Sequence, residues 1–266
     1  MLLVLDIGNS NIVAGVFAGA RLRHSWRFAT SVQKTSDEYA VLLEDFFKQS
    51  SVAPASVKAA ILSSVVPPLD PVIQDAILKL FRLKALAVSP ALDLGLTVAL
   101  RNPDEVGADR LVNAVAAYQG YGGPLLVLDF GTATTVDAIS ADGVYLGGAI
   151  APGVAISMEA LFSRTARLPR IDMAPPQSAI GDSTLQAIRS GIYYGTLGAT
   201  RELCERIGAE LRARDHKAPK VIATGGLSRW LPAAELGITA VVPDLTLQGL
   251  RLIWERNGRG KRRGRP

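Results

Sequence analysis

An internal duplication constrains the fold more than any other feature of this sequence. Residues 2–8 (LLVLDIG) recur 123 positions later as residues 125–131 (LLVLDFG), with a single difference. Each copy is a short apolar run followed by Asp-x-Gly and small polar residues, a pattern that predicts a buried strand ending in a tight turn. Because each copy begins about half of the 266 residues, the chain is expected to contain two related domains.

The residues after each copy repeat the same order of expected elements. Strands are expected at 12–17 and 21–28 in the first half and at 134–140 and 144–150 in the second. At 21–28, apolar or aromatic residues alternate with Arg and Ser, which is the period of a half-buried strand. His24 belongs to the apolar set, so we expect it to be packed in the core rather than catalytic.

Helices and further strands are expected to complete each half. Thr35 and Glu38 have the spacing of a capping box, and apolar residues follow them at helical spacing. Asn102 and Pro103 are typical of the first residues of another helix. The remaining expected elements are helices at 69–81, 153–162, 182–212 and 244–256 and strands at 59–66, 85–89 and 220–224.

This order predicts an N-terminal domain at 1–120 and a C-terminal domain at 121–256, two α/β domains that face each other across a cleft. Residues 257–266 are expected to form a disordered basic tail, with five of the 29 Lys and Arg residues and no acidic residue. Residues 1–256 therefore carry 24 basic and 24 acidic side chains. A body without net charge lacks the electrostatic footprint of a nucleic-acid-binding protein, so no nucleic-acid partner is expected.

The few cysteine and histidine residues exclude two further classes of protein. Cys204 is the single cysteine, and with two His residues it makes neither an intramolecular disulfide nor a plausible zinc site. A reducing cytoplasm is therefore the expected location. The N-terminus reaches Asp6 before a long apolar stretch develops, unlike a signal peptide. The longest uncharged run, between Arg110 and Asp129, is broken by the turn at 120–124, so no membrane association is expected.

Each Asp-x-Gly turn is a candidate phosphate loop. Glycine lets backbone N–H groups approach an anion, and a carboxylate at a strand end can hold a divalent cation beside it. Polar side chains follow in both loops, Asn9, Ser10 and Asn11 in the first and Thr132, Thr134 and Thr135 in the second. A single turn of this kind is weak evidence, but two symmetric copies favour binding of a triphosphate. Neither a Walker P-loop nor a Rossmann fingerprint is present in the sequence.

The segment 107–110 (GADR) is the second candidate site. Asp109 is a candidate acceptor for a substrate hydroxyl proton, and Arg110 is a candidate ligand for an anionic substrate group. The structural alternative is a solvated acid in the first helical turn that is paired with its neighbouring arginine. A third candidate is the strand at 221–224, which runs into Gly225 and Gly226 and is either an ordinary helix entry or a nucleoside contact.

Seven segments, in order along 1–256, resemble the type III pantothenate kinases. They are residues 6–11 (DIGNSN), 102–110 (NPDEVGADR), 129–135 (DFGTATT), 147–153 (GGAIAPG), 180–184 (IGDST), 223–226 (ATGG) and 245–250 (LTLQGL). Asp-x-Gly by itself indicates only the wider superfamily of actin, sugar kinases and chaperone ATPases. The GADR and GTATT segments are far more specific to the family.

The resemblance implies two duplicated RNase H-like domains of the actin-like ATPase type and an obligate homodimer. It also implies transfer of the ATP γ-phosphate to the primary hydroxyl of pantothenate, giving 4′-phosphopantothenate in the first step of coenzyme A biosynthesis. Catalysis of this kind depends mainly on positioning and charge neutralisation.

The family pattern also assigns roles to individual residues. Asp109 is the catalytic proton acceptor. Asp129 is the ligand of a monovalent cation, K⁺ or NH₄⁺, and Asp6 lies near the Mg²⁺ that accompanies ATP. The implied ATP-binding residues are Asp6, Ile7, Gly8, Asn9, Ser10, Asn11, Ile12, Val13 and Thr132. The implied substrate-binding residues are Gly107, Ala108, Asp109, Arg110 and Thr184.

Two positions depart from the family pattern, and two other functions remain as alternatives. Ser10 replaces the commoner Thr and keeps the hydroxyl group, whereas Leu100 stands where some members carry an aromatic residue near the substrate. One alternative is another kinase or phosphatase of the superfamily, against which the GADR segment argues. The other is a regulator that binds an acidic partner through its basic tail, although Asp6, Asp109 and Asp129 are all intact.

Overall fold

The computed structural model describes residues 1–164, 172 and 174–258 and divides the chain into two compact units. Unit 1 contains Met1–Leu96, Arg101–Ala116 and, at the C-terminal end, the residues from Leu245 onward; unit 2 contains Thr97–Leu100 and Ala117–Asp244. These boundaries differ from the expected 1–120 and 121–256, because the last helix belongs to unit 1. Most of the expected basic tail, residues 259–266, lies outside the described residues.

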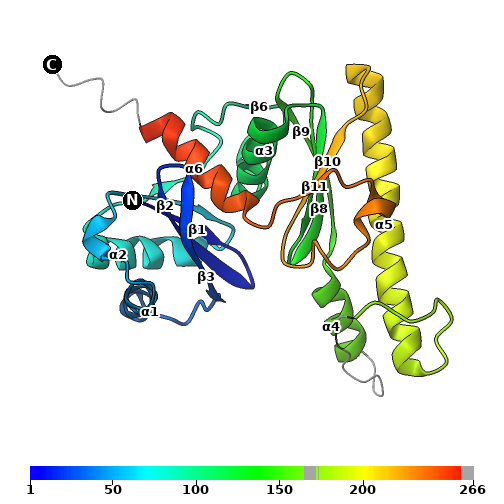
Figure 1. Ribbon diagram of the computed structural model, residues 1–266, viewed down its shortest axis with the longest axis horizontal. Helices are drawn as coiled ribbons and strands as arrows, with labels where there is room; N and C mark the ends of the chain where they lie inside the picture. Colours follow the sequence, from blue (N-terminus) through cyan, green and yellow to red (C-terminus); the bar gives the residue numbers. More distant parts are fainter. Residues whose placement is uncertain (165–171, 173, 259–266) are drawn as a thin grey trace. The chain divides into compact units, whose positions relative to one another are not determined.

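Unit 1 is built on a five-stranded sheet in the order β3-β2-β1-β4-β5 (Figure 1). Its strands are β1 (Leu2–Ile7), β2 (Asn11–Ala18), β3 (Arg21–Ala29), β4 (Ala59–Ser64) and β5 (Leu86–Ala87). Strand β1 is antiparallel to β2 and parallel to β4. The predicted strands at 12–17, 21–28 and 59–66 are therefore confirmed.

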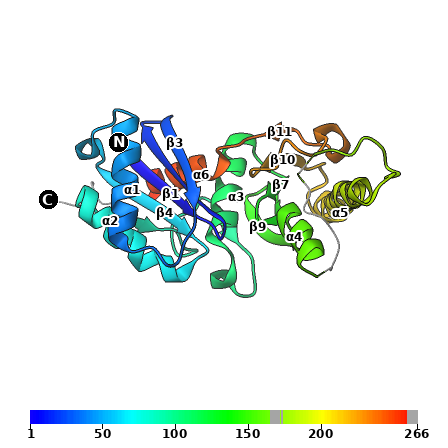
Figure 2. The same cartoon turned by 90° about the horizontal axis from the view of Figure 1, so that it is seen from below.

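Helices cover both faces of this sheet (Figure 2). Helices α1 (Ser36–Gln49) and α2 (Asp70–Phe81) pack with the side chains of Leu3, Leu5 and Ile7 in one core. Helix α6 (Leu245–Gly258) packs on the opposite face, where a Cβ on Gly15 would lie 3.0 Å from Cδ1 of Leu247. Val4 of β1 lies on this face, with its Cγ2 atom 3.2 Å from the same Cβ. Asp6, two residues further along β1, belongs to the same face of the sheet.

The contacts of α6 explain why this helix belongs to unit 1. It contacts β1, β2 and β4, and Leu245, Leu247 and Leu250 are buried there. Sequence proximity would place α6 with unit 2, but burial of its apolar side chains against the first sheet decides the matter.

Unit 2 repeats the sheet of unit 1 with one added strand. The order is β11-β10-β7-β8-β9-β6, so β7, β8, β9, β10 and β11 correspond to β1, β2, β3, β4 and β5. The strands are β6 (Thr97–Val98), β7 (Leu125–Phe130), β8 (Ala133–Ile139), β9 (Val144–Pro152), β10 (Lys220–Thr224) and β11 (Ala240–Val241). The register shifts between Val16 and Phe17 in β2 and, at the corresponding place in β8, between Ala138 and Ile139. The duplication predicted from the sequence is confirmed.

The remaining helices are α3 (Ala108–Tyr121), α4 (Val154–Arg164) and α5 (Thr184–Asp215). The expected helix start at Asn102 is wrong. Pro103–Glu105 form a single 3-10 turn, Val106 is extended, and α3 begins only after Gly107. Glycine is a poor helix former, costing ~1 kcal/mol relative to alanine, and it marks a boundary here rather than lying within the helix. None of the helices in the described part of the chain is both long and apolar enough to span a membrane.

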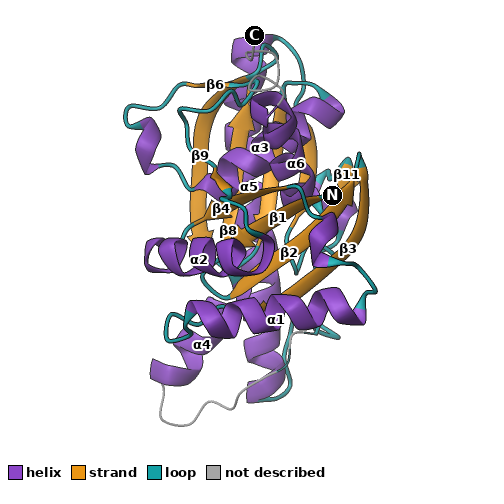
Figure 3. Ribbon diagram, turned by 90° about the vertical axis from the view of Figure 1, so that its left-hand side faces the viewer, coloured by secondary structure: helices purple, strands orange, loops and turns teal. Residues whose placement is uncertain are grey.

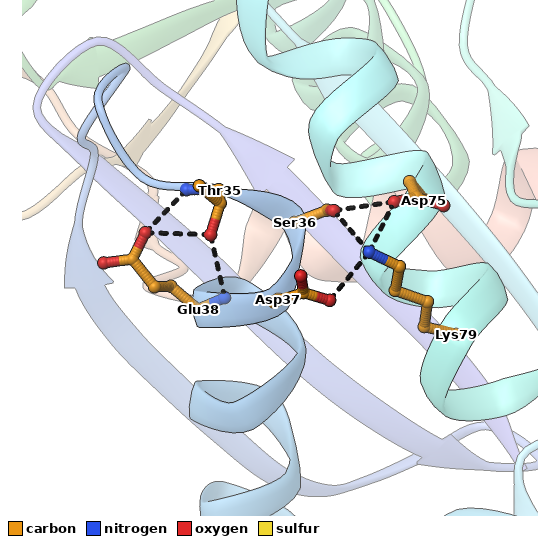
Figure 4. A network of polar contacts seen from close by, with 6 residues as sticks. All are labelled: Thr35, Ser36, Asp37, Glu38, Asp75 and Lys79. Carbon is orange, nitrogen blue, oxygen red and sulfur yellow. Dashed lines mark hydrogen bonds and ion pairs between the residues drawn. The ribbon is translucent and has the colours of Figure 1, made fainter.

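The predicted capping box of α1 is present. The backbone N–H of Glu38 donates to Thr35 Oγ1 at 3.3 Å, and the N–H of Thr35 donates to Glu38 Oε2 at 2.7 Å. The backbone N–H of Thr35 and its hydroxyl, which donates to Glu38 Oε2 at 2.9 Å, together lower the pKa of the Glu38 carboxyl group. Beside them, Lys79 of α2 forms ion pairs with Asp37 at 2.7 Å and Asp75 at 2.9 Å (Figure 4). The polar network thus joins α1 to α2, which run side by side along the first sheet (Figure 3).

Candidate functional site

The first candidate phosphate loop is the turn between β1 and β2. Gly8 donates its N–H to the carbonyl of Asn11 at 3.1 Å, which closes the turn. Thr30 follows β3 and anchors the loop twice, through Oγ1 to the Gly8 carbonyl at 2.6 Å and through N–H to the Ser10 carbonyl at 3.1 Å. Asn9 and Ser10 are exposed at its tip. The loop is therefore held from the sheet side and open on the other, as an anion-binding turn requires.

Asp6 lies at the end of β1, next to this loop. The pairing of strands places it between Val13 of β2 and Ser63 of β4. The hydroxyl of Ser63, which is fully buried, donates a hydrogen bond to Oδ1 of Asp6 at 2.7 Å. The orientation of the Asp6 carboxylate is thus set by a neighbouring strand.

The surroundings of Asp6 make its carboxylate hard to ionise. Burial raises the pKa of Asp6 to about 7. The Ser63 hydrogen bond opposes this rise in pKa, the nearby Asp109 carboxylate adds to it, and Arg27 opposes it. A cation beside the two carboxylates would relieve both the desolvation and the repulsion, since it favours the ionised form.

The donor set in unit 1 fits Mg²⁺ that arrives with phosphate. Carboxylate oxygens are the hard ligands that Mg²⁺ prefers, and it is usually bound by one or two of them together with phosphate oxygens and water. Across residues 1–164, 172 and 174–258, no group of three or more His, Cys, Asp or Glu side chains forms a metal cage. Asp6, with Asp109 in electrostatic range, matches a Mg²⁺ site that has one or two carboxylates and takes its other ligands from phosphate and water.

Asp109 is half-buried in the first turn of α3. Its Oδ1 accepts a hydrogen bond from the N–H of Arg110 at 2.8 Å. A Cβ on Gly107 would lie 2.5 Å from that same oxygen, so a side chain at this position would displace the carboxylate. The glycine in the GADR segment therefore leaves room for the Asp109 carboxylate at the start of the helix. Asp109 lies close enough to Asp6 to raise the pKa of the Asp6 carboxyl group.

The second candidate loop, between β7 and β8, has its own close approaches. Gly131 donates its N–H to the Ala133 carbonyl at 3.0 Å. Gly225 has a φ of +92°, and a Cβ there would lie 2.4 Å from Oδ1 of Asp129. A Cβ on Gly153 would lie 2.2 Å from the carbonyl oxygen of Thr132. Bare backbone therefore packs against both candidate residues of unit 2, Asp129 and Thr132.

The other sequence-predicted residues fall in separate parts of the chain. Thr184 is the exposed first residue of α5 and follows Ser183, whose hydroxyl accepts a hydrogen bond from the Gln186 N–H at 3.3 Å. It belongs to unit 2, whereas Gly107, Ala108, Asp109 and Arg110 belong to unit 1. Leu100 lies against β9, where a Cβ on Gly147 would be 3.1 Å from its Cδ2 atom.

Sequence reasoning missed Ser63 and Thr30, and it named Gly153 only as part of the segment 147–153. A signal for Ser63 was available, because it stands at the end of the predicted strand 59–66, and a strand parallel to β1 would bring that end beside Asp6. No local pattern distinguished Thr30. His24 is packed as expected, with its ring stacked on Trp26 at a centroid distance of 6.1 Å.

Two sheets of the same strand order, each with an aspartate ending its first strand, define the actin-like ATPase fold that sugar kinases share. A Baf-family protein from Campylobacter jejuni, named as a transcriptional activator, has a TM-score of 0.61 with 20% identity over 97% of this chain and 99% of its own. The activator of 2-hydroxyisocaproyl-CoA dehydratase from Clostridium difficile, solved with bound ADPNP, has a TM-score of 0.57 with 13% identity over 100% and 98%. At these identities the likeness shows the fold.

The sequence profile of type III pantothenate kinase matches residues 2–206. The type III pantothenate kinase of Geobacter sulfurreducens is 46% identical over 257 residues, which cover 97% of this chain and 99% of that enzyme. The chain belongs to the type III pantothenate kinase family. The family phosphorylates pantothenate in coenzyme A biosynthesis, so this chain is an ATP-dependent phosphotransferase that works with Mg²⁺ and ATP.

Proposed function

We propose that this chain transfers the γ-phosphate of ATP to the primary hydroxyl of pantothenate with Asp109 as the proton acceptor. The observation that carries the proposal is that the start of α3 adjoins the end of β1 within unit 1. A Cβ on Gly107 would lie 3.6 Å from Val65, whose N–H donates to the Ile7 carbonyl. Asp109 is also close enough to Asp6 to raise the pKa of that carboxyl group. A carboxylate base needs only hydrogen-bond reach of the hydroxyl as that oxygen attacks. The hydrogen bond from the Arg110 N–H to Oδ1 orients the Asp109 carboxylate at the start of α3.

The remaining residues of unit 1 bind and orient the two substrates. Residues 6–13 form the ATP-binding segment, and the exposed Asn9 and Ser10 at the tip of its loop contact the phosphates. Asp6 holds Mg²⁺, which when bound neutralises charge on the phosphate oxygens. Arg110 binds the pantothenate carboxylate, because a guanidinium matches a carboxylate in a paired hydrogen-bond geometry. Gly107 and Ala108 give the substrate access to the backbone at the start of α3.

Unit 2 contributes Thr132 to ATP, Thr184 to pantothenate and Asp129 to a monovalent cation, K⁺ or NH₄⁺. The support for the cation is the carboxylate of Asp129 at a strand end, against the bare backbone of Gly225.

We also propose that the working protein is a cytoplasmic homodimer. Unit 2 exposes large apolar side chains, among them Ile180 at 86% and Ile150 at 64% exposure. On α5, an added Cβ at Gly191, Gly195 or Gly198 would meet no atom of the described chain within 4 Å beyond the neighbouring backbone of the helix itself. Small residues in a row let a second helix approach closely, and exposed apolar surface of this kind favours an interface between subunits.

The test is formation of phosphopantothenate, measured by mass spectrometry with MgATP, with and without K⁺. The wild-type chain is expected to make product, with more in K⁺ than without. Asp109→Asn is expected to lower kcat by roughly 10²–10⁴-fold. Asp104→Asn is the matched control, since Asp104 is exposed in the 3-10 turn before α3. Equal rates for Asp109→Asn and wild type would remove Asp109 from the role of base. A folded wild-type protein that makes no product would refute the pantothenate reaction.

A further inference from the structure

Arg27 occupies a place in the first sheet that the assignments above do not use. It pairs with Val13 of β2, and Val13 pairs with Asp6 of β1. Residues directly opposite each other on neighbouring strands present their side chains on the same face of a sheet. Arg27 and Asp6 therefore share one face, two strands or about 10 Å apart.

The position of Arg27 along β3 brings it close to the phosphate loop. Two residues further on, Ala29 pairs with Asn11, the last residue of that loop. The next residue, Thr30, makes the two hydrogen bonds that anchor Gly8 and Ser10. Arg27 thus lies about 7 Å along the strand from the row of the loop itself.

The guanidinium of Arg27 has no ion-pair partner in the described ranges of the chain, and the residue is exposed. It is nevertheless close enough to Asp6 to lower the pKa of that carboxyl group. A cationic side chain that faces a carboxylate row and a turn of N–H groups, but is paired with neither, is available to an anionic ligand.

The duplicated sheet shows that the scaffold does not require an arginine here. In unit 2, Asp129 pairs with Thr135, and Thr135 pairs with Ile150. Ile150 therefore occupies the place of Arg27, and its side chain is 64% exposed. Since the same row folds with an isoleucine, the arginine in unit 1 is explained by chemistry rather than by folding.

We infer that Arg27 is a phosphate-binding residue of the kinase site, whose guanidinium donates N–H groups to oxygens of the ATP polyphosphate chain on the loop Gly8–Asn11. The inference rests on the proposed function and names a further residue of the same site. Arginine suits this role because its planar fork matches phosphate oxygens and stays charged at any physiological pH. A kinase site must above all stabilise the negative charge on the phosphoryl group during its transfer.

The test compares Arg27→Gln and Arg27→Lys with Arg23→Gln. Arg23 lies on the same strand and the same exposed face, four residues or about 13 Å from Arg27, so it matches in charge and setting. Binding of a non-hydrolysable ATP analogue with Mg²⁺ is measured by calorimetry, and kcat and KM are measured for ATP and pantothenate. Arg27→Gln is expected to weaken analogue binding by roughly 10–100-fold and to leave the KM for pantothenate unchanged. Arg27→Lys is expected to fall between Gln and wild type, and Arg23→Gln to match wild type.

Two results would overturn the inference. One is an unchanged analogue dissociation constant in Arg27→Gln, and the other is an equal loss in Arg23→Gln, which would show a diffuse charge effect. Thermal unfolding of each variant checks the fold, and if Arg27→Gln is unfolded, the Arg27→Lys measurement decides. A wild-type chain that binds the analogue but makes no phosphopantothenate would refute the proposed substrate and leave the Arg27 comparison intact.

Discussion

The two sheets carry equivalent aspartates in different surroundings. In unit 1, the row across the strands reads Arg27, Val13, Asp6 and Ser63; in unit 2, it reads Ile150, Thr135, Asp129 and Thr224. The strand order and the burial pattern of β1 and β7 are the same in both units. The duplication therefore kept the scaffold and changed the chemistry of the row that each aspartate belongs to.

The loops after the two aspartates also differ. Ile7 pairs with Ile12 in unit 1, whereas Phe130 pairs with Thr134 in unit 2, so the second loop is one residue shorter. Gly8 closes its turn on Asn11, and Gly131 closes its turn on Ala133. The longer loop offers more exposed polar groups, whereas the shorter one is packed against Gly153 and Gly225. This difference fits a phosphate loop in unit 1 and a more enclosed cation site in unit 2.

The largest expected effect separates the two aspartates by activity. Asp6→Asn is expected to lower kcat/KM roughly 10²–10³-fold at every salt concentration, the size of losing one preorganised electrostatic contact. Asp129→Asn is expected to abolish the activation by K⁺. Its rate should therefore fall below the wild-type rate chiefly in buffer that contains K⁺. Steady-state rates across a KCl titration check both variants. Identical salt profiles for the two would end the proposed division of roles.

The pKa of Asp6 predicts how stability depends on pH in the absence of Mg²⁺. Because the pKa is about 7 in the folded chain against 3.8 ordinarily, the folded state binds more protons between these pH values. The free energy of unfolding that Asp6 contributes is therefore present below pH 4 and is lost as the pH rises to 7, by about 4 kcal/mol. Urea unfolding at several pH values in EDTA should show this decline in wild type relative to Asp6→Asn. Parallel curves for the two proteins would contradict the raised pKa.

A smaller effect is expected at the glycine that packs against Asp129. Gly225→Ala introduces a Cβ at positive φ within 2.4 Å of Asp129 Oδ1, so the free energy of unfolding should fall by about 2 kcal/mol. Gly226→Ala is the matched control, since nothing of the described chain lies within 4 Å of a Cβ there. Chemical denaturation of both variants measures the difference. Equal stabilities would mean that the close approach in unit 2 is not needed.

The smallest effect compares the first residues of two helices. Thr35→Ala removes the hydrogen bond that Oγ1 accepts from the Glu38 N–H and the one that Oγ1 donates to Glu38 Oε2, and keeps the backbone N–H bond to Glu38. It should cost about 1 kcal/mol of unfolding free energy. Ser183→Ala removes one hydrogen bond of 3.3 Å at the start of α5 and should cost less. Thermal unfolding resolves both. A larger loss in Ser183→Ala would show that the start of α5 is held by contacts other than its cap.

Local patterns predicted most of the elements of both units. The repeated LLVLD segments, the alternation at 21–28 and the Thr35–Glu38 spacing each depend on neighbours in sequence, and each element formed where expected. The two-residue strands β6 and β11 were not predicted, because two residues carry no periodic signal. The late start of α3 was also missed, because Asn102 and Pro103 satisfy the same preferences in a 3-10 turn as in a helix.

The sequence by itself determined the duplication, the family, and the aspartates and glycines of the candidate site. The tertiary structure decided which side chains surround those residues. That Ser63 donates to Asp6 depends on β4 lying parallel to β1, and that Arg27 shares its face depends on the register of β2 and β3. It also decided that α6 belongs to unit 1. The reason is physical: hydrogen-bonded register and burial join residues far apart in the chain, and no local pattern records which partners they will meet.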